Sequence, residues 1–552
     1  MRSIRWIISA VFVCNAIMFC GGLAAIFFLP SPEQRANDAN VLRIGYSPEK
    51  ETLFRQLADG FNRTGTPYRI EPVKLDPDDL VEQATSGQFA AVSPDSAVWL
   101  DQIDRAWQAK HPDAGGLTAS LTRYAVSPIV IAMWERVARE FNYPTRPVGW
   151  VTIMDRALRD SSFRWSHPSS STASGLLAVT AEFYAGAGNP ARLSVQDIAR
   201  PETVDYVRRI QRTVQQYGAE TEDQFVDRLL SGEARNLDAF VVQEQFVILF
   251  NGRSTGEKLV AVYPAEGSLW LDHPLALLEG PWLTTSQRQA YRAFTDYLGR
   301  PETGQLVLAA GYRPADLKIP LDERTSPIRP ENGVDPAQPF TSLVLPATPV
   351  LERIRDSWTL LKRPANIYLI ADVSGSMQGD RITRAREALL SFVDQIKDGR
   401  DRVGFATFST ATREQVALET LDKNRSDLER AIRAMSPGGN TALYDAIDFG
   451  VQRVGELREN DRINVVVVMT DGEENASRRE LVAGRGDPSQ LIAAIEERAR
   501  RTGTPVVVFT IAYGGEAELA VLRRIAESTN GQAYRSDPET IRKLYRTLSQ
   551  TF

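Results

Sequence analysis

The sequence predicts an α/β protein made of two successive α/β parts that follow an N-terminal membrane segment. Apolar, strand-like stretches alternate with helical stretches from Val41 to about Arg313 and again from Pro364 to Phe552. Such alternation is typical of α/β domains. Before the first part, Trp6–Leu29 contains no charged residue, and between the two parts prolines recur at short intervals.

The composition excludes several classes of function. The net charge is −6, so there is no basic field to attract nucleic acid. The only cysteines, Cys14 and Cys20, lie in the first apolar segment, and the chain has three histidines. Thiolate metal sites and disulfides in the body of the protein are therefore excluded, and a zinc-hydrolase site would need an unusual ligand set.

The apolar segment predicts a membrane anchor. As a helix, its 24 residues would extend about 36 Å, enough to cross a hydrocarbon core of roughly 30 Å. Arg2 and Arg5 precede it, which favours a cytoplasmic N-terminus and a periplasmic or extracellular body. We therefore expect a cytoplasmic stub and single-pass anchor at 1–32 and a tether at 33–40. A cleaved signal peptide and a lipoprotein acylated at Cys20 are the alternatives.

The first part, 41–313, is expected to begin with a strand at Val41–Tyr46 and a helix around Glu51–Asn62. Further strands are expected at Phe89–Val92, Ile129–Met133, Ala239–Val242 and Leu259–Tyr263.

Prolines then recur through 314–363 and predict an extended, semi-rigid connector. The alternative is that part of it packs on a neighbouring domain, either Ser342–Leu345 or Val350–Leu361 as a helix.

The second part, 364–552, shows the most regular alternation. The expected strands are Ile367–Ala371, Val403–Phe408, Asn464–Met469 and Val506–Ala512. The expected helices are Arg381–Ile396, Ser426–Met435, Ala442–Val454, Pro488–Arg501 and Glu516–Thr529. Continuous apolar strands indicate a parallel sheet covered by helices on both faces. This part is thus predicted to be a doubly wound, Rossmann-like domain.

Three loops of this part carry side chains with oxygen donors. Asp372, Ser374 and Ser376 come after the first strand, Thr441 opens a helix, and Asp471 follows the valine-rich strand. Ligands of open α/β sheets gather beyond the carboxyl ends of the strands, and a small hard cation prefers about six oxygen ligands. The alternative reading is that these side chains cap helices.

In order and placement, Asp372-x-Ser374-x-Ser376, Thr441 and Thr470-Asp471-Gly472 match the metal-ion-dependent adhesion site (MIDAS) of von Willebrand factor A (VWA) domains. The resemblance covers about one third of the chain. It implies a bound Mg²⁺, with Mn²⁺ or Ca²⁺ as substitutes, and a protein partner whose Asp or Glu completes the coordination. It also implies binding without catalysis, so we expect no enzymatic activity.

The first part resembles type II periplasmic solute-binding proteins, which are bacterial. The stretches that carry this resemblance are Ile44–Ser47, Val92–Ser96, Ser127–Ile131, His167–Gly175, Val262–Pro264, Asp272–Pro274 and Gly311–Pro314. The family implies two lobes that close on a small solute, and we expect the chain to cross between them near Ser127 and Ala239.

Four serines are the candidate solute contacts: Ser47, Ser93, Ser127 and Ser174. The alternative is that these serines serve only as caps and turns.

The sequence thus predicts a membrane-anchored extracytoplasmic protein that binds a partner through Mg²⁺ and senses or holds a small solute. The alternative function is a solute receptor for an ABC permease, with the VWA domain as a docking module. A regulatory factor working with AAA ATPases and a metal-dependent hydrolase are less favoured, because such ATPases are cytoplasmic and no paired general base is visible.

Overall fold

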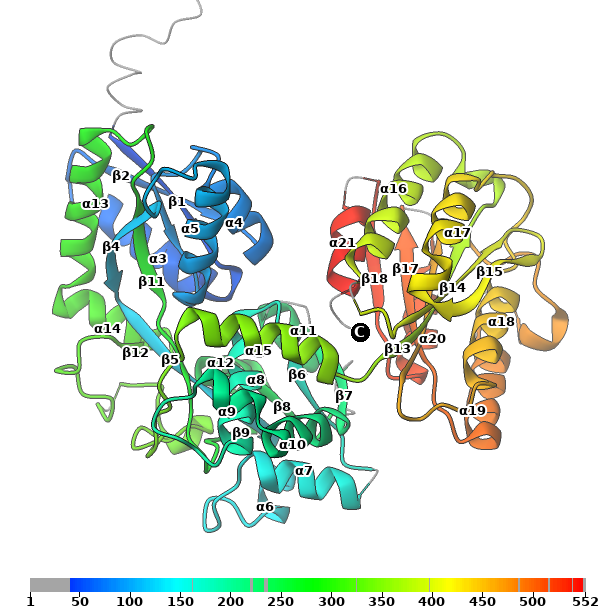
Figure 1. The fold of residues 1–552 in the computed structure, drawn as a ribbon, viewed down its shortest axis with the longest axis horizontal. Helices are drawn as coiled ribbons and strands as arrows, with labels where there is room; N and C mark the ends of the chain where they lie inside the picture. Colours follow the sequence, from blue (N-terminus) through cyan, green and yellow to red (C-terminus); the bar gives the residue numbers. More distant parts are fainter. Residues whose placement is uncertain are drawn as a thin grey trace, which may run out of the picture. The chain divides into compact units, whose positions relative to one another are not determined.

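The computed structural model describes residues 40–160, 162–218, 222–232, 237–323, 325–396, 398–484, 487–514, 517–538 and 540–549 (Figure 1). Within these ranges, no helix combines the length and the apolar character that a membrane crossing requires. The anchor predicted at Trp6–Leu29 lies outside the described residues.

The chain divides into two compact units. Among the described residues, the first unit comprises those from Asn40 to Ala125, His273–Val307 and Pro314–Ile319, and the second comprises those of Val126–Asp272, Leu308–Arg313 and Pro320 onwards. The chain leaves the first unit after Ala125, close to the crossing predicted near Ser127. The crossing predicted near Ala239 is wrong, because the strand that begins there pairs with two strands of the second unit.

The first unit contains a five-stranded mixed sheet with the strand order β2-β1-β3-β11-β4. Its strands are β1 (Val41–Tyr46), β2 (Arg69–Lys74), β3 (Ala91–Ser93), β4 (Thr118–Arg123) and β11 (Pro274–Leu278), and its helices are α3 (Glu51–Asn62), α4 (Pro77–Ala84), α5 (Val98–Lys110), α13 (Thr285–Leu298) and most of α14 (Pro301–Ala309). The strand predicted at Val41–Tyr46 and the helix predicted at Glu51–Asn62 are confirmed.

The second unit begins with a seven-stranded sheet in which β10-β5-β8-β6-β7 form a path and β9 and β12 also pair with β5. The strands are β5 (Ala125–Trp134), β6 (Trp165–Pro168), β7 (Val214–Gly218), β8 (Ala239–Gln243), β9 (Leu259–Val262), β10 (Trp270–Leu271) and β12 (Arg313–Pro314). The helices are α6 (Glu135–Glu140), α7 (Trp150–Arg159), α8 (Ala173–Gly186), α9 (Val195–Ala199), α10 (Pro201–Gln211), α11 (Glu222–Ser231) and α12 (Glu244–Arg253).

The proline-rich stretch 314–363 is not extended throughout, and the alternative of a packed helix over its last part is confirmed. Its last part is the helix α15 (Thr348–Leu361), which packs on α8, α9 and α10 (Figure 1). Pro349 is tolerated because it lies in the first turn, where its missing N–H would have no helical acceptor. The inner face of this helix carries three buried side chains, those of Ile354, Trp358 and Leu361.

A six-stranded sheet of order β15-β14-β13-β16-β17-β18 follows, parallel except for β15. Its strands are β13 (Ala365–Asp372), β14 (Arg402–Phe408), β15 (Thr412–Thr420), β16 (Ile463–Thr470), β17 (Val507–Tyr513) and β18 (Ala533–Ser536). Its helices are α16 (Asp380–Gln395), α17 (Leu421–Arg433), α18 (Leu443–Gly455), α19 (Ser489–Thr502), α20 (Leu519–Ser528) and α21 (Ile541–Ser549).

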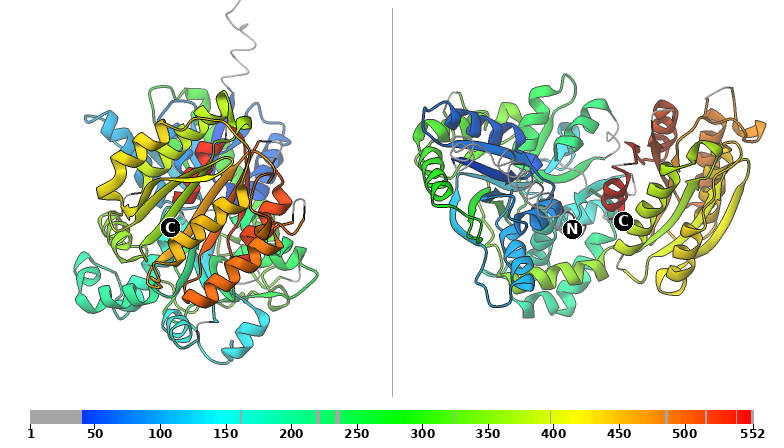
Figure 2. Two further views of the ribbon diagram at one scale, coloured as in Figure 1. Left: turned by 90° about the vertical axis from the view of Figure 1, so that its right-hand side faces the viewer. Right: turned by 90° about the horizontal axis from the view of Figure 1, so that it is seen from above.

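Helices cover both faces of this sheet (Figure 2). Helix α18 packs on β13 and β16, and α19 packs on α18, whereas α16 packs between α17 and α21. All residues of β13 and β16 are buried, which explains their continuous apolar character. The chain runs from β13 outwards to β14 and later returns to β16 on the other side of β13. The strand order therefore reverses at β13 and β16, the point where open α/β sheets bind ligands.

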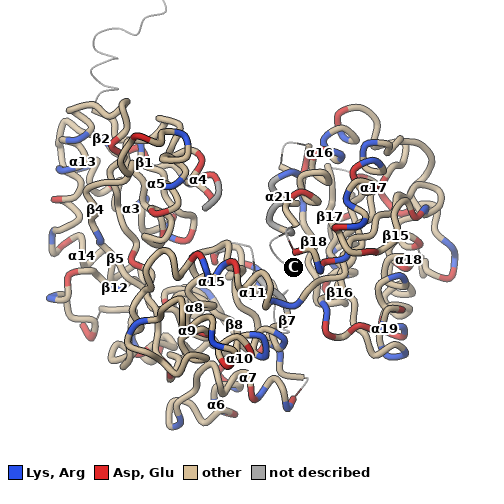
Figure 3. Tube along the Cα trace, in the orientation of Figure 1, with Lys and Arg blue, Asp and Glu red and all other residues tan. Residues whose placement is uncertain are grey.

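Acidic and basic residues are interspersed over the described residues (Figure 3). This distribution agrees with the nearly balanced totals of 64 Lys and Arg and 70 Asp and Glu.

Candidate metal centre and solute-binding residues

Three loops meet at the carboxyl edge of the six-stranded sheet. Backbone hydrogen bonds join the loop after β13 to the loop before α18, from Gly438 N to Val373 O (2.7 Å) and from Gly375 N to Gly439 O (3.0 Å). A third bond, from Asn475 N to Thr441 O (3.0 Å), joins the loop after β16 to the same loop before α18. The five predicted metal-site residues all lie on these loops or at their ends.

Asp372 lies at the end of β13 and is fully buried. Its Oδ1 accepts a hydrogen bond from Ser374 N (2.7 Å), and its Oδ2 accepts one from the Thr470 hydroxyl (2.6 Å). Burial raises the pKa of the Asp372 carboxyl to about 6, against the lowering effect of these two donors. The site thus holds a carboxylate whose charge is poorly compensated by its neutral partners.

Asp471 is the second fully buried carboxylate. Its Oδ1 accepts a hydrogen bond from the Ser376 hydroxyl (2.6 Å), which in turn lies 3.0 Å from the Ser374 hydroxyl. Its Oδ2 accepts a hydrogen bond from Arg381 Nη1 (2.8 Å). Ser376 is exposed, so a group outside the protein can reach this side of the cluster.

Thr441 is the fifth residue of the cluster and lies next to Gly472. A methyl group built on Gly472 would lie 3.4 Å from the Thr441 hydroxyl and 3.8 Å from that of Ser376. Both hydroxyls therefore border the space next to Gly472. The Thr441 backbone is fixed by a hydrogen bond from its N–H to the Asn475 side chain (2.9 Å).

The donor set suits a small hard cation, because all of its side-chain donors are oxygens and two are buried carboxylates. Its shortage of carboxylates also explains why, in the described ranges, no group of three or more His, Cys, Asp or Glu residues has the geometry of a metal site. The structure brings Asp372, Ser374, Ser376, Thr441 and Asp471 together; their role as metal ligands stays a prediction.

Ser47 and Ser93, two predicted solute contacts, lie at the carboxyl ends of β1 and β3 in the first unit. Both are buried. The Ser47 hydroxyl accepts a hydrogen bond from Asp95 N (3.0 Å), and the Ser93 hydroxyl donates to Pro274 O (2.8 Å) and lies 3.0 Å from the Tyr124 hydroxyl. In this structure both hydroxyls take part in hydrogen bonds within their own unit.

A buried ionic cluster beside these serines escaped the sequence analysis. Lys50 Nζ donates to the Ser93 hydroxyl (3.0 Å) and to Pro94 O, and it lies over the Tyr124 ring. Burial raises the pKa of Asp95 to about 6, while the charge of Lys50 opposes the shift. A lysine in an ordinary amphipathic stretch gives no sequence signal of burial.

Ser127 and Ser174, the other two predicted contacts, lie in the second unit and are also buried. The Ser127 hydroxyl donates to Gln245 Oε1, and the Ser174 hydroxyl donates to Glu222 Oε1 (3.0 Å). Ser174 lies in the first turn of α8, where the Thr172 hydroxyl caps the helix by accepting from Gly175 N (3.0 Å). Two of the four serines thus lie in each unit. Their role as solute contacts stays a prediction.

Two family models match the chain. The von Willebrand factor type A domain model matches residues 366–547, and the bacterial extracellular solute-binding protein model matches residues 42–313. The chain combines a bacterial solute-binding domain with a VWA domain.

Curated relatives match over about a third of the chain. "Uncharacterized protein sll0103" of Synechocystis sp. is 26% identical over 197 residues, which are 34% of this chain and 42% of that protein. Inter-alpha-trypsin inhibitor heavy chain H3 of Mus musculus is 26% identical over 180 residues, which are 31% of this chain and 19% of that protein. The alignments thus span less than half the length of these relatives.

Solved structures also match over a portion of the chain. A von Willebrand factor type A protein from Catenulispora acidiphila has 21% identity and a TM-score of 0.29 over 34% of this chain and 43% of that one. The ferric binding protein from Campylobacter jejuni has 10% identity and a TM-score of 0.42 over 58% of this chain and 98% of that one.

Glu474 of the VWA domain caps the start of α18. Its carboxylate accepts hydrogen bonds from Tyr444 N (2.8 Å), at the start of α18, and from the backbone of Ala476 and Ser477 (2.9 and 2.7 Å). The sequence analysis missed Arg381, because an arginine at the start of a predicted helix carries no sign of contact with a distant aspartate.

A buried polar network connects α15 with the solute-binding domain. Gln211 Nε2 donates to Glu182 Oε2 (2.6 Å) and to His167 Nε2 (3.0 Å), and the His167 Nδ1–H donates to Pro168 O (2.7 Å). The Trp358 indole of α15 donates to Gln211 Oε1 (3.0 Å). Burial raises the pKa of Glu182 to about 8 and lowers the pKa of His167 to about 4.

The end of α15 is joined to the VWA domain by polar contacts. Arg400 donates to the carbonyls of Thr359 (3.1 Å) and Lys362 (3.3 Å), and Lys362 Nζ lies 3.7 Å from Asp401. Arg363 donates to Arg462 O (2.7 Å). These contacts are made at the start of β13, β14 and β16, the edge of the sheet opposite the metal-site residues.

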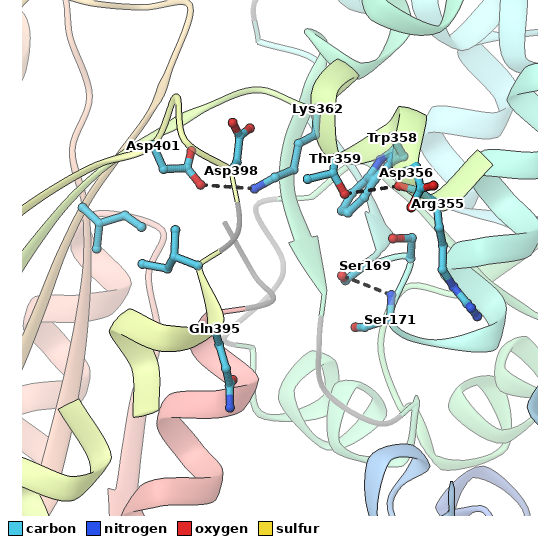
Figure 4. Close-up of a pocket in the computed structure, with 13 residues that line it drawn as sticks. Ser169, Ser171, Arg355, Asp356, Trp358, Thr359, Lys362, Gln395, Asp398 and Asp401 are labelled. Carbon is cyan, nitrogen blue, oxygen red and sulfur yellow. Dashed lines mark hydrogen bonds and ion pairs between the residues drawn. The ribbon is translucent and has the colours of Figure 1, made fainter. Parts of the chain in front are cut away.

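A hollow of about 370 Å³ lies beside this junction in the second unit (Figure 4). Ser169 and Ser171 of the loop before α8 line it together with Arg355 and Lys362 from α15 and its end. The loop belongs to the stretch His167–Gly175 that carried the solute-binding resemblance. The structure therefore places the connector helix against the loop that precedes α8.

Proposed function

We propose that the VWA domain binds a divalent cation through Asp372, Ser374, Ser376, Thr441 and Asp471, and grips a partner's carboxylate through that ion. The observation that carries the proposal is the position of two buried carboxylates beside three hydroxyls at the reversal point of the sheet. A bound Mg²⁺ would supply a Lewis-acidic position for an Asp or Glu of a protein partner. The exposed Ser376 marks the side from which that carboxylate enters.

The protein's own residues are suited to hold such an ion. Asp372 is oriented by the Thr470 hydroxyl and the Ser374 amide, and Asp471 is oriented by the Ser376 hydroxyl. Buried carboxylates without a full set of positive partners gain from a cation. No general base is needed for this function, so we propose a binding protein and not an enzyme.

We further propose that the chain is anchored by Trp6–Leu29 with its body outside the cytoplasm, periplasmic or extracellular. The match to a bacterial extracellular solute-binding family supports this side of the membrane. Removal of residues 1–39 should move the protein from the membrane fraction to the soluble fraction after ultracentrifugation. A truncated chain that still sediments with membranes would contradict the anchor.

For the solute-binding domain we propose that it holds a small solute, either as a sensor or as a receptor for an ABC permease. The family match to residues 42–313 supports solute binding. A thermal-shift screen of the full chain against oxyanions, sugars and amino acids tests the proposal. A stabilising solute supports it, and a complete absence of shifts would count against both versions.

The metal site is tested by calorimetric titration of Mg²⁺ into the full-length chain, its Asp372→Asn variant and its Asp427→Asn variant. Asn keeps the shape of Asp372 and removes its charge, whereas Asp427 is an exposed residue of α17. We expect binding heat from the wild type and D427N and none from D372N. The absence of binding heat from the wild type, or equal heat from D372N, would overturn the proposed site.

A further inference from the structure

Arg381 places a positive charge directly on the proposed metal site. It lies in the first turn of α16, and its Nη1 donates to Asp471 Oδ2 (2.8 Å) and to Ser376 O (3.3 Å). The Asp471 side chain is 0% exposed, whereas that of Arg381 is 32% exposed. A partly exposed cation thus neutralises a fully buried carboxylate.

The backbone of Arg381 is fixed beside the site by a hydrogen bond. The buried Tyr513 at the end of β17 donates its hydroxyl hydrogen to Arg381 O (3.1 Å). A side chain on Gly514 would lie 3.9 Å from the guanidinium group, so this group also borders the end of β17. Because the backbone is fixed while the side chain reaches solvent, the guanidinium can leave Asp471 without unfolding α16.

The two carboxylates of the cluster differ in their partners. Asp372 accepts hydrogen bonds from two neutral groups, the Ser374 amide and the Thr470 hydroxyl, whereas Asp471 forms an ion pair with Arg381. A divalent cation among the hydroxyls would meet both the attraction of the carboxylates and the repulsion of the guanidinium.

We propose that Arg381 is an internal counter-ion of Asp471 that competes with the divalent cation and thereby weakens its binding. The inference rests on the proposed metal site. In the metal-free protein the guanidinium compensates the buried charge of Asp471. When the ion binds, it takes over this compensation, and Arg381 turns towards solvent. By weakening the affinity, Arg381 then raises the concentration of the ion that is needed to fill the site.

A purely structural role makes the opposite prediction. If Arg381 only orients Asp471 for the ion, its removal would leave the carboxylate misplaced and binding would weaken. The direction of the change in affinity therefore separates competition from positioning.

The experiment is Mg²⁺ titration calorimetry on the full-length wild type and on R381Q, R381K and R384Q. Gln removes the charge, Lys keeps it, and Arg384 is an exposed residue of the same helix whose partner is Glu387. We expect R381Q to bind Mg²⁺ about ten-fold more tightly, since a like charge beside the ion is removed. R381K and R384Q should stay close to the wild type.

Thermal unfolding provides a second measurement. Without Mg²⁺, R381Q should melt at a lower temperature than the wild type because Asp471 has lost its counter-ion, and Mg²⁺ should raise its Tm by more than that of the wild type. Binding by R381Q alone also supports the inference. If the wild type binds Mg²⁺ and R381Q binds it equally or more weakly, the inference about Arg381 is wrong but the proposed metal site is supported. If neither folded protein binds Mg²⁺, the proposed metal site itself is wrong.

Discussion

Replacing Glu182 by Gln should change how the stability of the protein depends on pH. The Glu182 side chain is 0% exposed and accepts a hydrogen bond from Gln211 Nε2. Burial raises its pKa from 4.5 to about 8. A raised pKa means that the folded protein keeps the proton while the unfolded chain ionises, so the free energy of unfolding falls as the pH rises through this interval.

The neighbouring His167 has the opposite effect at lower pH. Burial lowers its pKa from 6.5 to about 4, so its contribution to stability is complete above pH 6.5 and is lost as the pH falls towards 4. The two residues oppose each other between pH 4.5 and 6.5, and only Glu182 contributes between pH 6.5 and 8. At about 1.4 kcal/mol per pH unit, this interval should cost the wild type about 2 kcal/mol.

Urea unfolding at pH 6.5, 7.0, 7.5 and 8.0 tests this reasoning. Gln is neutral at each pH and can still accept the hydrogen bond from Gln211, so E182Q should lose the downward slope. Glu202, an exposed residue of α10, provides the control, and E202Q should retain the wild-type slope. Parallel stability curves for the wild type and E182Q would refute a neutral Glu182 in the folded protein.

Three further changes have defined outcomes. Arg313→Met should destabilise the protein by about 3–5 kcal/mol in urea unfolding, because it leaves Glu244 buried without its paired cation, and a double variant with E244Q should recover much of the loss. Gly472→Ala should preserve the fold but weaken Mg²⁺ binding at least about ten-fold by calorimetry, because its methyl group would contact the Thr441 hydroxyl. Trp358→Phe should lower the free energy of unfolding by about 1 kcal/mol through loss of the indole hydrogen bond, and an unchanged urea midpoint would contradict the network.

The sequence predicted the VWA domain's buried strands well, because strands covered on both faces are continuously apolar. Asn464–Met469 was predicted, and β16 spans Ile463–Thr470. The edge strand β15 was missed, since Thr412–Thr420 is mostly polar and one side of it faces solvent. Helix α21 at the C-terminus was missed as well, and α15 was offered only as an alternative to an extended connector.

The candidate site could likewise be predicted from the sequence only in part. Its five oxygen donors follow strand ends or open a helix, so their convergence could be inferred from the chain alone. Arg381 and Lys50 could not be found in this way, because an ion pair between distant segments depends on side-chain packing that no local pattern encodes. For the four serines the sequence indicated position but not hydrogen bonding, and the structure shows that each hydroxyl already has a protein partner.

The placement of the metal-site residues and the connector at opposite ends of β13 has a mechanical consequence. A partner held at Asp372 and a connector held at Pro364 would pull on one strand from its two ends, about 26 Å apart for eight residues. β13 is hydrogen-bonded along its length to β14 on one side and to β16 on the other. Such tension would run along the covalent backbone of β13, while the two ladders keep the strand from leaving the sheet, so the central strand is suited to carry load between a bound partner and the connector.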